Sequence, residues 1–248
     1  MFPIRDHNPS NRTPYVTLAL IAINVVIFLS YVSVLGDPRA SMQVFVTWGL
    51  VPAQLSSGGG VANIFTSMFF HGGFMHLAGN MLFLWVFGDN LEDEMGHGTF
   101  LGFYLLSGVG AGLAQVISDP TSPIPMVGAS GAIAGVLGGY LLLYPKARVD
   151  VLFIIVIIFK IIPIPAGIVL SIWFAMQVFS GAATPAGSGG VAYWAHAGGF
   201  VAGLVLVLPL WLKLGGTGFW SRTHGHPDHP EARYRQMRTR VPQVQRRR

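Results

Sequence analysis

Five stretches of 17 to 22 residues carry no charged side chain, and they limit what this sequence can fold into more than any other feature. They cover residues 15–35, 98–118, 127–144, 164–180 and 191–212. A helix needs about 20 mainly apolar residues to cross the roughly 30 Å hydrocarbon core of a bilayer. Only 10% of the residues are charged, whereas soluble domains contain about 25%. The sequence therefore predicts a polytopic membrane protein.

A sixth apolar stretch, residues 74–91, follows the pair Gly72-Gly73 and contains His76 and Asn80. The predicted fold class is an all-α bundle of six transmembrane helices over residues 15–214. We read the first span as retained, because it is too long for the apolar region of a signal peptide. Residues 1–14 are predicted to form a short polar tail, and residues 215–248 a basic, disordered tail.

The connections between these spans differ in character. Residues 36–72 interleave aromatic side chains with proline and glycine, so we expect them to lie in the membrane interface. The acidic residues 92–94 are predicted to form a turn between two spans. Residues 151–159 are apolar but too short to cross a bilayer, and we expect a re-entrant or buried piece there.

The distribution of basic residues predicts the orientation. With six spans, both termini lie on one side of the membrane, and 14 of the 15 Lys and Arg residues fall on that side, leaving Arg39 alone on the other. Cytoplasmic loops are enriched in Lys and Arg. Both termini are therefore predicted to be cytoplasmic, and the spans that carry His76, Ser130 and His196 all enter from the outer face.

The sequence Gly128-Ala129-Ser130-Gly131 places a hydroxyl at a tight turn into a helix. A helix N-terminus offers free backbone N–H groups that suit an oxyanion. Ser130 is therefore a candidate nucleophile. The alternative is that this small-residue sequence serves only close helix packing.

A serine nucleophile needs a base, and His196 is the best placed of the eight histidines. Gly199 and Gly203 lie four residues apart on one face of its helix, and Gly131, Gly135 and Gly139 repeat in the same way after Ser130. Small residues let two membrane helices approach closely. The two glycine faces are predicted to meet and to bring His196 to Ser130, although a lone histidine can also be a buried hydrogen-bonding residue.

None of the ten acidic residues lies in the outer half of a predicted span, and only Asp119 comes near. We therefore expect a Ser–His dyad without an orienting carboxylate. His76 and Asn80 lie one helical turn apart, so both project from one face. Their N–H groups are candidate oxyanion donors; Asn80 could instead bond a neighbouring helix.

These residues belong to motifs that occur in a fixed order, and the set resembles the rhomboid family of intramembrane serine proteases. The resemblance covers about residues 63–212. The motifs are HGGFMHLAGN at 71–80, then Glu92 with Gly96 and Phe100, then GASG at 128–131, and AHAGGF at 195–200 with Gly203.

The resemblance implies a six-helix fold with a site open to the outer face, Ser130 as nucleophile, His196 as base, and His76 with Asn80 as oxyanion donors. It further implies that residues 36–72 form a membrane-embedded loop and that Trp173 and Phe174 belong to a lateral gate for substrate. Some members stack an aromatic residue on the histidine from the position that is Ala134 here, so an aromatic of residues 164–180 is expected to fill that space.

The expected function is therefore cleavage of transmembrane segments of membrane-protein substrates near the outer face. The expected location is the bacterial inner membrane, and the partners are these substrates and the lipid bilayer, not nucleic acid. No metal or cofactor is expected, and the absence of cysteine excludes disulfides and thiolate sites.

Two other readings stay open. One is a catalytically inactive rhomboid-like protein that binds clients, and the other is a transporter with His76 and His196 as a proton relay. No inverted repeat of broken helices supports a transporter. The arginines from Arg233 onward could contact anionic lipid or be solvated.

Overall fold

A computed structural model of the protein describes residues 2–155, 158–185 and 189–227. Its helices are α1 (Tyr15–Tyr31), α2 (Pro38–Trp48), α3 (Pro52–Ser56), α4 (Asn63–Thr66), α5 (Phe74–Met95), α6 (His97–Ser118), α7 (Ser130–Leu143), α8 (Ala166–Ala183), α9 (Tyr193–Lys213) and α10 (Thr217–Thr223). Its strands are β1 (Phe2–Asp6), β2 (Arg148–Ile155) and β3 (Ile158–Pro165). Short 3-10 turns, Val32–Val34 and Ser67–Phe69, follow α1 and α4.

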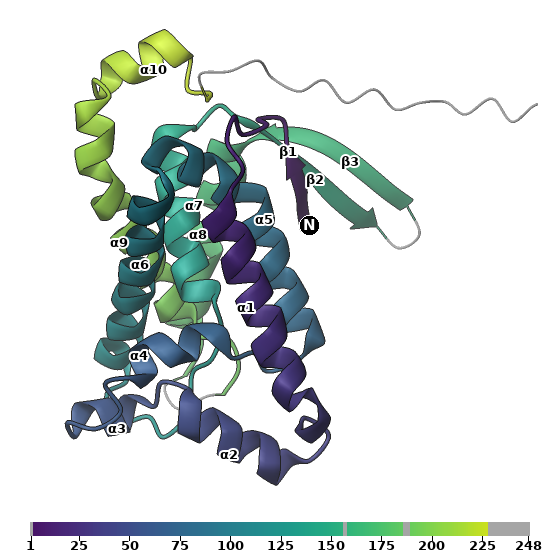
Figure 1. Ribbon diagram of the computed structural model, residues 1–248, viewed down its shortest axis with the longest axis vertical. Helices are drawn as coiled ribbons and strands as arrows, with labels where there is room; N and C mark the ends of the chain where they lie inside the picture. Colours follow the sequence, from purple (N-terminus) through teal and green to yellow (C-terminus); the bar gives the residue numbers. More distant parts are fainter. Residues whose placement is uncertain (1, 156–157, 186–188, 228–248) are drawn as a thin grey trace, which may run out of the picture.

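The long helices α1, α5, α6, α7, α8 and α9 stand side by side, and α7 lies inside the group they form (Figure 1). Eleven of the 14 residues of α7 are buried, and α7 packs against α5, α6, α8 and α9. The short helices α2, α3 and α4 lie at one end of the bundle, whereas the sheet and α10 lie at the other (Figure 1). The helix α7, which is apolar on every face, therefore forms the core of the bundle.

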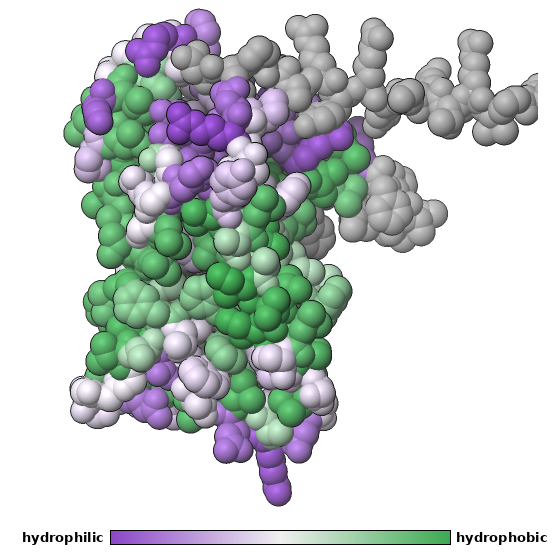
Figure 2. Space-filling view, in the orientation of Figure 1, coloured by the Kyte–Doolittle hydropathy of each residue, from purple (hydrophilic) through white to green (hydrophobic). Residues whose placement is uncertain are grey.

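On the face shown in Figure 2, hydrophobic residues form a band across the middle of the bundle, and hydrophilic residues gather at both ends. Four helical segments of the described chain are long and apolar enough to cross a membrane: Tyr15–Val34, α6, α8 and α9. The helix α7 is apolar but has only 14 residues, and α5 has four acidic residues among its 22. The chain is an integral membrane protein with a mainly helical fold.

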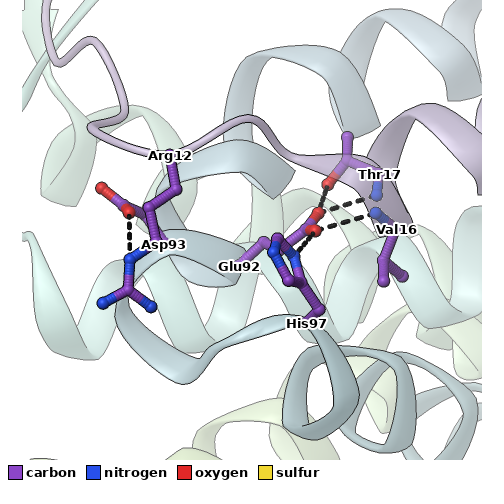
Figure 3. A network of polar contacts seen from close by, with 6 residues as sticks. All are labelled: Arg12, Val16, Thr17, Glu92, Asp93 and His97. Carbon is purple, nitrogen blue, oxygen red and sulfur yellow. Dashed lines mark hydrogen bonds and ion pairs between the residues drawn. The ribbon is translucent and has the colours of Figure 1, made fainter.

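The helix α5 continues to Met95, so the prediction of an acidic turn at residues 92–94 is wrong. Glu92 is buried and accepts hydrogen bonds from the backbone N–H groups of Val16 and Thr17, from the Thr17 hydroxyl and from the His97 ring (Figure 3). Pro14, the N-cap residue of α1, offers no side-chain cap. Glu92 therefore supplies from α5 the cap that α1 lacks, and hydrogen bonds to a charged group contribute about 1.5–3 kcal/mol.

The chain turns directly from α5 into α6 at Gly96, which has φ +76°. This left-handed conformation favours glycine, since a Cβ would clash with the backbone there. The sharp turn explains why two antiparallel helices of 22 residues each follow one another with a single residue between them.

A three-stranded antiparallel sheet, in the order β1-β2-β3, corrects two predictions. The fold is not all-α, and the apolar residues 151–159 are not a re-entrant piece, because their described part belongs to the β2–β3 hairpin. The predicted polar tail at residues 1–14 likewise contains β1, which pairs with β2 through Pro3 and Val151. A short apolar run does not by itself distinguish a strand from a buried helical segment.

Ionic hydrogen bonds hold β1 on β2. Asp150 accepts from the Arg5 guanidinium at 2.7 Å and lies 2.8 Å from the His7 ring nitrogen Nε2. Burial opposes the ionisation of Asp150, but the hydrogen bonds from His7 and Arg5 outweigh it and keep the pKa of this carboxyl below its usual value.

The C-terminal region also differs from its prediction. Residues 217–223 form α10, whose Phe219 is buried, and Trp220 donates a hydrogen bond to the Leu142 carbonyl at the end of α7. The basic part of the predicted tail from residue 228 onward lies outside the described residues.

The segment between α1 and α5 is built from short helices tied together by side chains. Asn63 donates to the carbonyls of Thr47 and Gly49, and Leu50 forms a two-way backbone bridge with Met126. This bridge holds the extended segment that leads into α7, which begins four residues after Met126.

Candidate active site

Ser130 is the first residue of α7, and the backbone before it has an unusual shape. Gly128 has φ +134°, and a Cβ at this position would lie 2.8 Å from the His76 ring nitrogen Nε2. Only glycine fits both constraints. The turn into α7 therefore brings His76 of α5 close to the backbone beside Ser130.

The first helical hydrogen bond of α7 runs from the Ile133 N–H to the Ala129 carbonyl. The N–H groups of the first turn have no carbonyl partner within the helix, as at every helix start. They carry the positive end of the helix dipole. The turn thus presents donors suited to a developing negative charge.

The helices α7 and α9 meet through their glycines, as the sequence predicted. A Cβ added at Gly199 would clash with the Gly131 carbonyl, and one added at Gly203 would clash with the Gly135 carbonyl. Gly139 does not continue this contact, since it faces Leu91 and Phe103, whereas Gly138 meets the Phe200 carbonyl. The backbones of the two helices are therefore in direct contact.

This contact brings the two predicted catalytic residues together. His196, in the first turn of α9, has its ring nitrogen Nε2 2.8 Å from the Ser130 hydroxyl oxygen. That is the distance of a hydrogen bond between a nucleophile and its base. The arrangement can transfer the hydroxyl proton to the imidazole.

The two predicted oxyanion donors lie on the same cavity as Ser130. The His76 nitrogen Nδ1 accepts from the Gly72 backbone N–H at 3.3 Å. Asn80 is buried, and its amide nitrogen Nδ2 has no hydrogen-bond partner among the described residues. A buried unpaired donor on the wall of the cavity is available to a group that binds there.

Gln177 of α8 was missed from the sequence. Its side-chain oxygen Oε1 lies 2.8 Å from the His196 nitrogen Nδ1, on the opposite edge of the ring from Ser130. The predicted dyad lacks an orienting carboxylate, but an amide oxygen is also an acceptor. A polar residue within an apolar span, one turn after Trp173, is the signal that could have identified it.

The predicted gate residues occupy two different environments. The Trp173 ring lies 5.8 Å from the His196 ring, centroid to centroid, with 34° between the planes, and lines the cavity. Phe174 instead stacks on Phe200 of α9 at 4.6 Å. Trp173 is thus an aromatic side chain beside His196 in a site where residue 134 is alanine.

A cavity of about 930 Å³ joins these residues. Its wall includes the residues already described, among them Trp173 and His196. It also includes Phe45 of α2 and three polar residues at the end of α6: Gln115, Ser118 and Asp119. Backbone at membrane depth must be buried in protein or must line a wet cavity. The cavity supplies such a place around Ser130.

Comparison with known proteins identifies the family. The model of the rhomboid domain matches residues 58–213, which is more than half of the chain. The chain belongs to the rhomboid family. The candidate catalytic residues Ser130 and His196 and the candidate oxyanion donors His76 and Asn80 all lie within the part of this rhomboid that the family model matches.

Individual relatives are similar over part of their length. The chain is 33% identical to the Rhomboid protease GluP of Bacillus subtilis over 53% of this chain and 25% of the relative. It is 32% identical to the mitochondrial Rhomboid protein 1 of Saccharomyces cerevisiae over 58% and 40%, respectively. It is 33% identical to the Rhomboid protease AarA of Providencia stuartii over 48% and 47%. The chain thus spans less than half of each of these relatives.

Proposed function

We propose that this rhomboid is an intramembrane serine endopeptidase that cleaves transmembrane segments of membrane-protein substrates. The observation that carries the proposal is the 2.8 Å contact between the Ser130 hydroxyl and His196 Nε2 at the wall of a 930 Å³ cavity. Relatives named as proteases support the same reaction class.

The chemistry is acyl transfer through a Ser–His dyad. His196 Nε2 takes the Ser130 proton as the hydroxyl oxygen bonds to the substrate carbonyl carbon. When the tetrahedral intermediate collapses, the peptide C–N bond breaks and His196 gives the proton to the leaving amine. A water molecule, deprotonated by His196, then attacks the acyl-enzyme carbonyl carbon. The ester C–O bond breaks, His196 returns the proton to the Ser130 oxygen, and the carboxyl product leaves.

The negative oxygen of each tetrahedral intermediate needs hydrogen-bond donors. We assign this role to the Asn80 Nδ2 group, the His76 ring and the backbone N–H at the start of α7. Asn80 supports the assignment because its amide nitrogen is buried without a partner. Such donors are effective because they are already in place before the charge develops.

The length of α7 supports a nucleophile below the membrane surface. Its 14 residues span roughly 21 Å, whereas the hydrocarbon core is about 30 Å thick. A helix with its far end at one boundary therefore begins roughly 9 Å short of the other boundary. We propose that α1 and α5 to α9 are the six spans and that Trp173 and Phe174 of α8 lie at the lateral entry for substrate.

We further propose that the sheet and both chain ends face the cytoplasm and that the site faces outward. In the described chain, the sheet and the segments beside it carry Arg5, Lys146, Arg148 and Lys160, whereas Arg39 lies on α2 at the site end. This asymmetry supports the orientation through the positive-inside rule. The membrane we propose is a bacterial inner membrane; matched relatives also include mitochondrial and chloroplast proteins.

The proposal is tested with protein reconstituted in liposomes that contain a model substrate with one transmembrane segment. Wild type should cleave it, whereas Ser130→Ala and His196→Ala should lose at least about 10³-fold in rate. A fluorophosphonate should label wild type but not Ser130→Ala. Equal cleavage by all three proteins would refute the assignment.

The same experiment separates the alternatives. A client-binding rhomboid without activity would retain the substrate but would neither cleave it nor react with the fluorophosphonate. A transporter would show a proton flux that survives Ser130→Ala.

A further inference from the structure

The His196 ring contacts side chains through both of its nitrogens. Nε2 lies 2.8 Å from the Ser130 hydroxyl, and Nδ1 lies 2.8 Å from the Gln177 oxygen Oε1. Residues of α7, α9 and α8 thus form one continuous chain of hydrogen bonds. A neutral imidazole has one N–H and one lone pair, and the partner of each nitrogen decides which carries the proton.

The amide of Gln177 is itself oriented by its own helix. Its nitrogen Nε2 donates to the Trp173 carbonyl, one turn earlier in α8, at 3.4 Å. A carbonyl only accepts hydrogen bonds, so the NH₂ group stays on Trp173 and the oxygen Oε1 turns to His196. With the amide reversed, the Gln177 oxygen Oε1 would face the Trp173 carbonyl oxygen, and the NH₂ group of Gln177 would face His196 Nδ1.

This orientation determines the tautomer of His196. An amide oxygen has no proton to donate, so Nδ1 must carry the N–H that bonds to Oε1. The lone pair is then on Nε2, which faces the hydroxyl proton of Ser130. The reversed amide would leave the N–H on Nε2, where it could not accept that proton.

We propose that Gln177 is a positioning residue that holds His196 in the tautomer able to accept the Ser130 proton. The inference rests on the proposed function. The hydrogen bond from Nδ1–H to Oε1 persists after His196 is protonated, so the ring keeps its position through the reaction. Within the membrane, a neutral amide performs this role without the desolvation cost of a carboxylate.

Two substitutions at residue 177 separate hydrogen bonding from packing. Gln177→Met keeps a side chain of similar length and volume but removes the amide oxygen. Gln177→Glu keeps an acceptor oxygen in either protonation state of the carboxyl group. A wrong tautomer costs roughly 10⁴-fold in kcat in soluble serine proteases. We expect Gln177→Met to lower kcat roughly 100-fold with KM changed less than about threefold, and Gln177→Glu to restore kcat to within about fivefold of wild type.

The tautomer is measured directly by ¹⁵N NMR of histidine-labelled protein in detergent, with the His196 signals identified by their absence from His196→Ala. Wild type and Gln177→Glu should show the proton on Nδ1, whereas Gln177→Met should lose this preference. Gln43→Met on α2 is the matched control, because Gln43 is exposed and does not line the cavity. It should match wild type in both kcat and tautomer.

The outcomes are distinguishable from a failure of the proposed function. If wild type cleaves substrate and Ser130 reacts with the fluorophosphonate, but Gln177→Met keeps wild-type kcat, the role of Gln177 is wrong and the dyad stands. A Gln177→Met variant that loses activity with an unchanged tautomer, or without rescue by Gln177→Glu, overturns the inference in favour of a packing role. Cleavage that persists in Ser130→Ala overturns the protease itself.

Discussion

Asn80, a proposed oxyanion donor, has an amide nitrogen that would be available before substrate binds. Its side chain is buried with 8% of its surface exposed, yet the amide nitrogen has no partner among the described residues. An unpaired buried donor costs the resting protein about 1–3 kcal/mol. In the proposed mechanism, that cost is recovered when a negative oxygen binds.

Asn80→Ala is therefore expected to affect catalysis and not stability. We expect kcat to fall 10²- to 10³-fold, which corresponds to about 2.7–4 kcal/mol of barrier. KM and the melting temperature in detergent should change little, because no hydrogen bond of this amide nitrogen is lost in the resting state. Cleavage kinetics and thermal unfolding of the same preparation measure both quantities.

Asn24 provides the control. It is also buried, but its amide nitrogen donates to the Leu20 carbonyl of the same helix at 2.8 Å. Asn24→Ala should lower the melting temperature and leave kcat unchanged. An Asn80→Ala variant that unfolds as readily as Asn24→Ala while keeping its kcat would mean that Asn80 is only structural.

Among single residues, the sequence predicted those whose type is dictated by the proposed reaction. Ser130 and His196 could be paired because few polar side chains occur at the matching depth of the apolar spans. Gln177 could not be assigned, because the role depends on which way an amide points. That direction is set by the Trp173 carbonyl, which sequence does not place.

Among the elements, the contact between α7 and α9 determines whether the site exists. The backbone carbonyls of Gly131 and Gly135 fill the space where Gly199 and Gly203 would carry a side chain. No rotamer change can make room, because the obstacle is backbone. The distance between Ser130 and His196 therefore depends on the absence of side chains at the glycines of this interface.

Gly203→Ala should push the two helices apart. Inserting a methyl group into a packed interface costs about 1–3 kcal/mol, so both the melting temperature and the cleavage rate should fall. Gly102→Ala on α6 is the control, because a Cβ there meets no atom within 4 Å. Equal melting temperatures and rates for the two variants would show that the close approach is not required.

The pattern of glycines predicted this contact only in part, for a geometric reason. Residues four apart drift by about 40° around a helix at 3.6 residues per turn. The backbones of Gly131 and Gly135 thus still contact α9, although a Cβ at either residue would point first at α6. Gly139 has rotated further, toward α5 and α6, and Gly138 meets α9 in its place. The pairing of β1 with β2 was missed for another reason: the two strands lie about 145 residues apart, so no local pattern reveals the partner.

For the whole molecule, Asp6 links the sheet to the helical bundle. Its carboxyl accepts from the Tyr140 hydroxyl of α7 at 3.1 Å and from the Asn8 amide at 3.3 Å. Burial, with the nearby charge of Asp89 on α5, raises the pKa of Asp6 to about 7. The unfolded chain has an ordinary Asp pKa near 3.9. Between these values the folded protein holds the extra proton, so stability falls as pH rises toward and through 7.

The prediction is a pH-dependent difference between wild type and Asp6→Asn. Asparagine is neutral at every pH, so the variant should gain in melting temperature relative to wild type as pH rises from 5 to 8.5. Thermal unfolding in detergent at several pH values measures this. A constant difference across the range would contradict the role of Asp6.

For Asp150→Asn we expect the opposite pH dependence of stability. The pKa of Asp150 lies below its usual value, so its ionised form stabilises the fold at neutral pH and this contribution is lost as pH falls through the acidic range. This variant should be less stable than wild type at pH 7, and the difference should shrink toward pH 3.

The sheet also places a condition on how the protein is made. The strand β1 precedes α1, but its partner β2 follows α7, so the ribosome must synthesise the helices α1 to α7 before the two strands can pair. The early helices can enter the bilayer during that time, whereas β1 stays unpaired. The strand β1 is therefore one of the last elements to reach its final position.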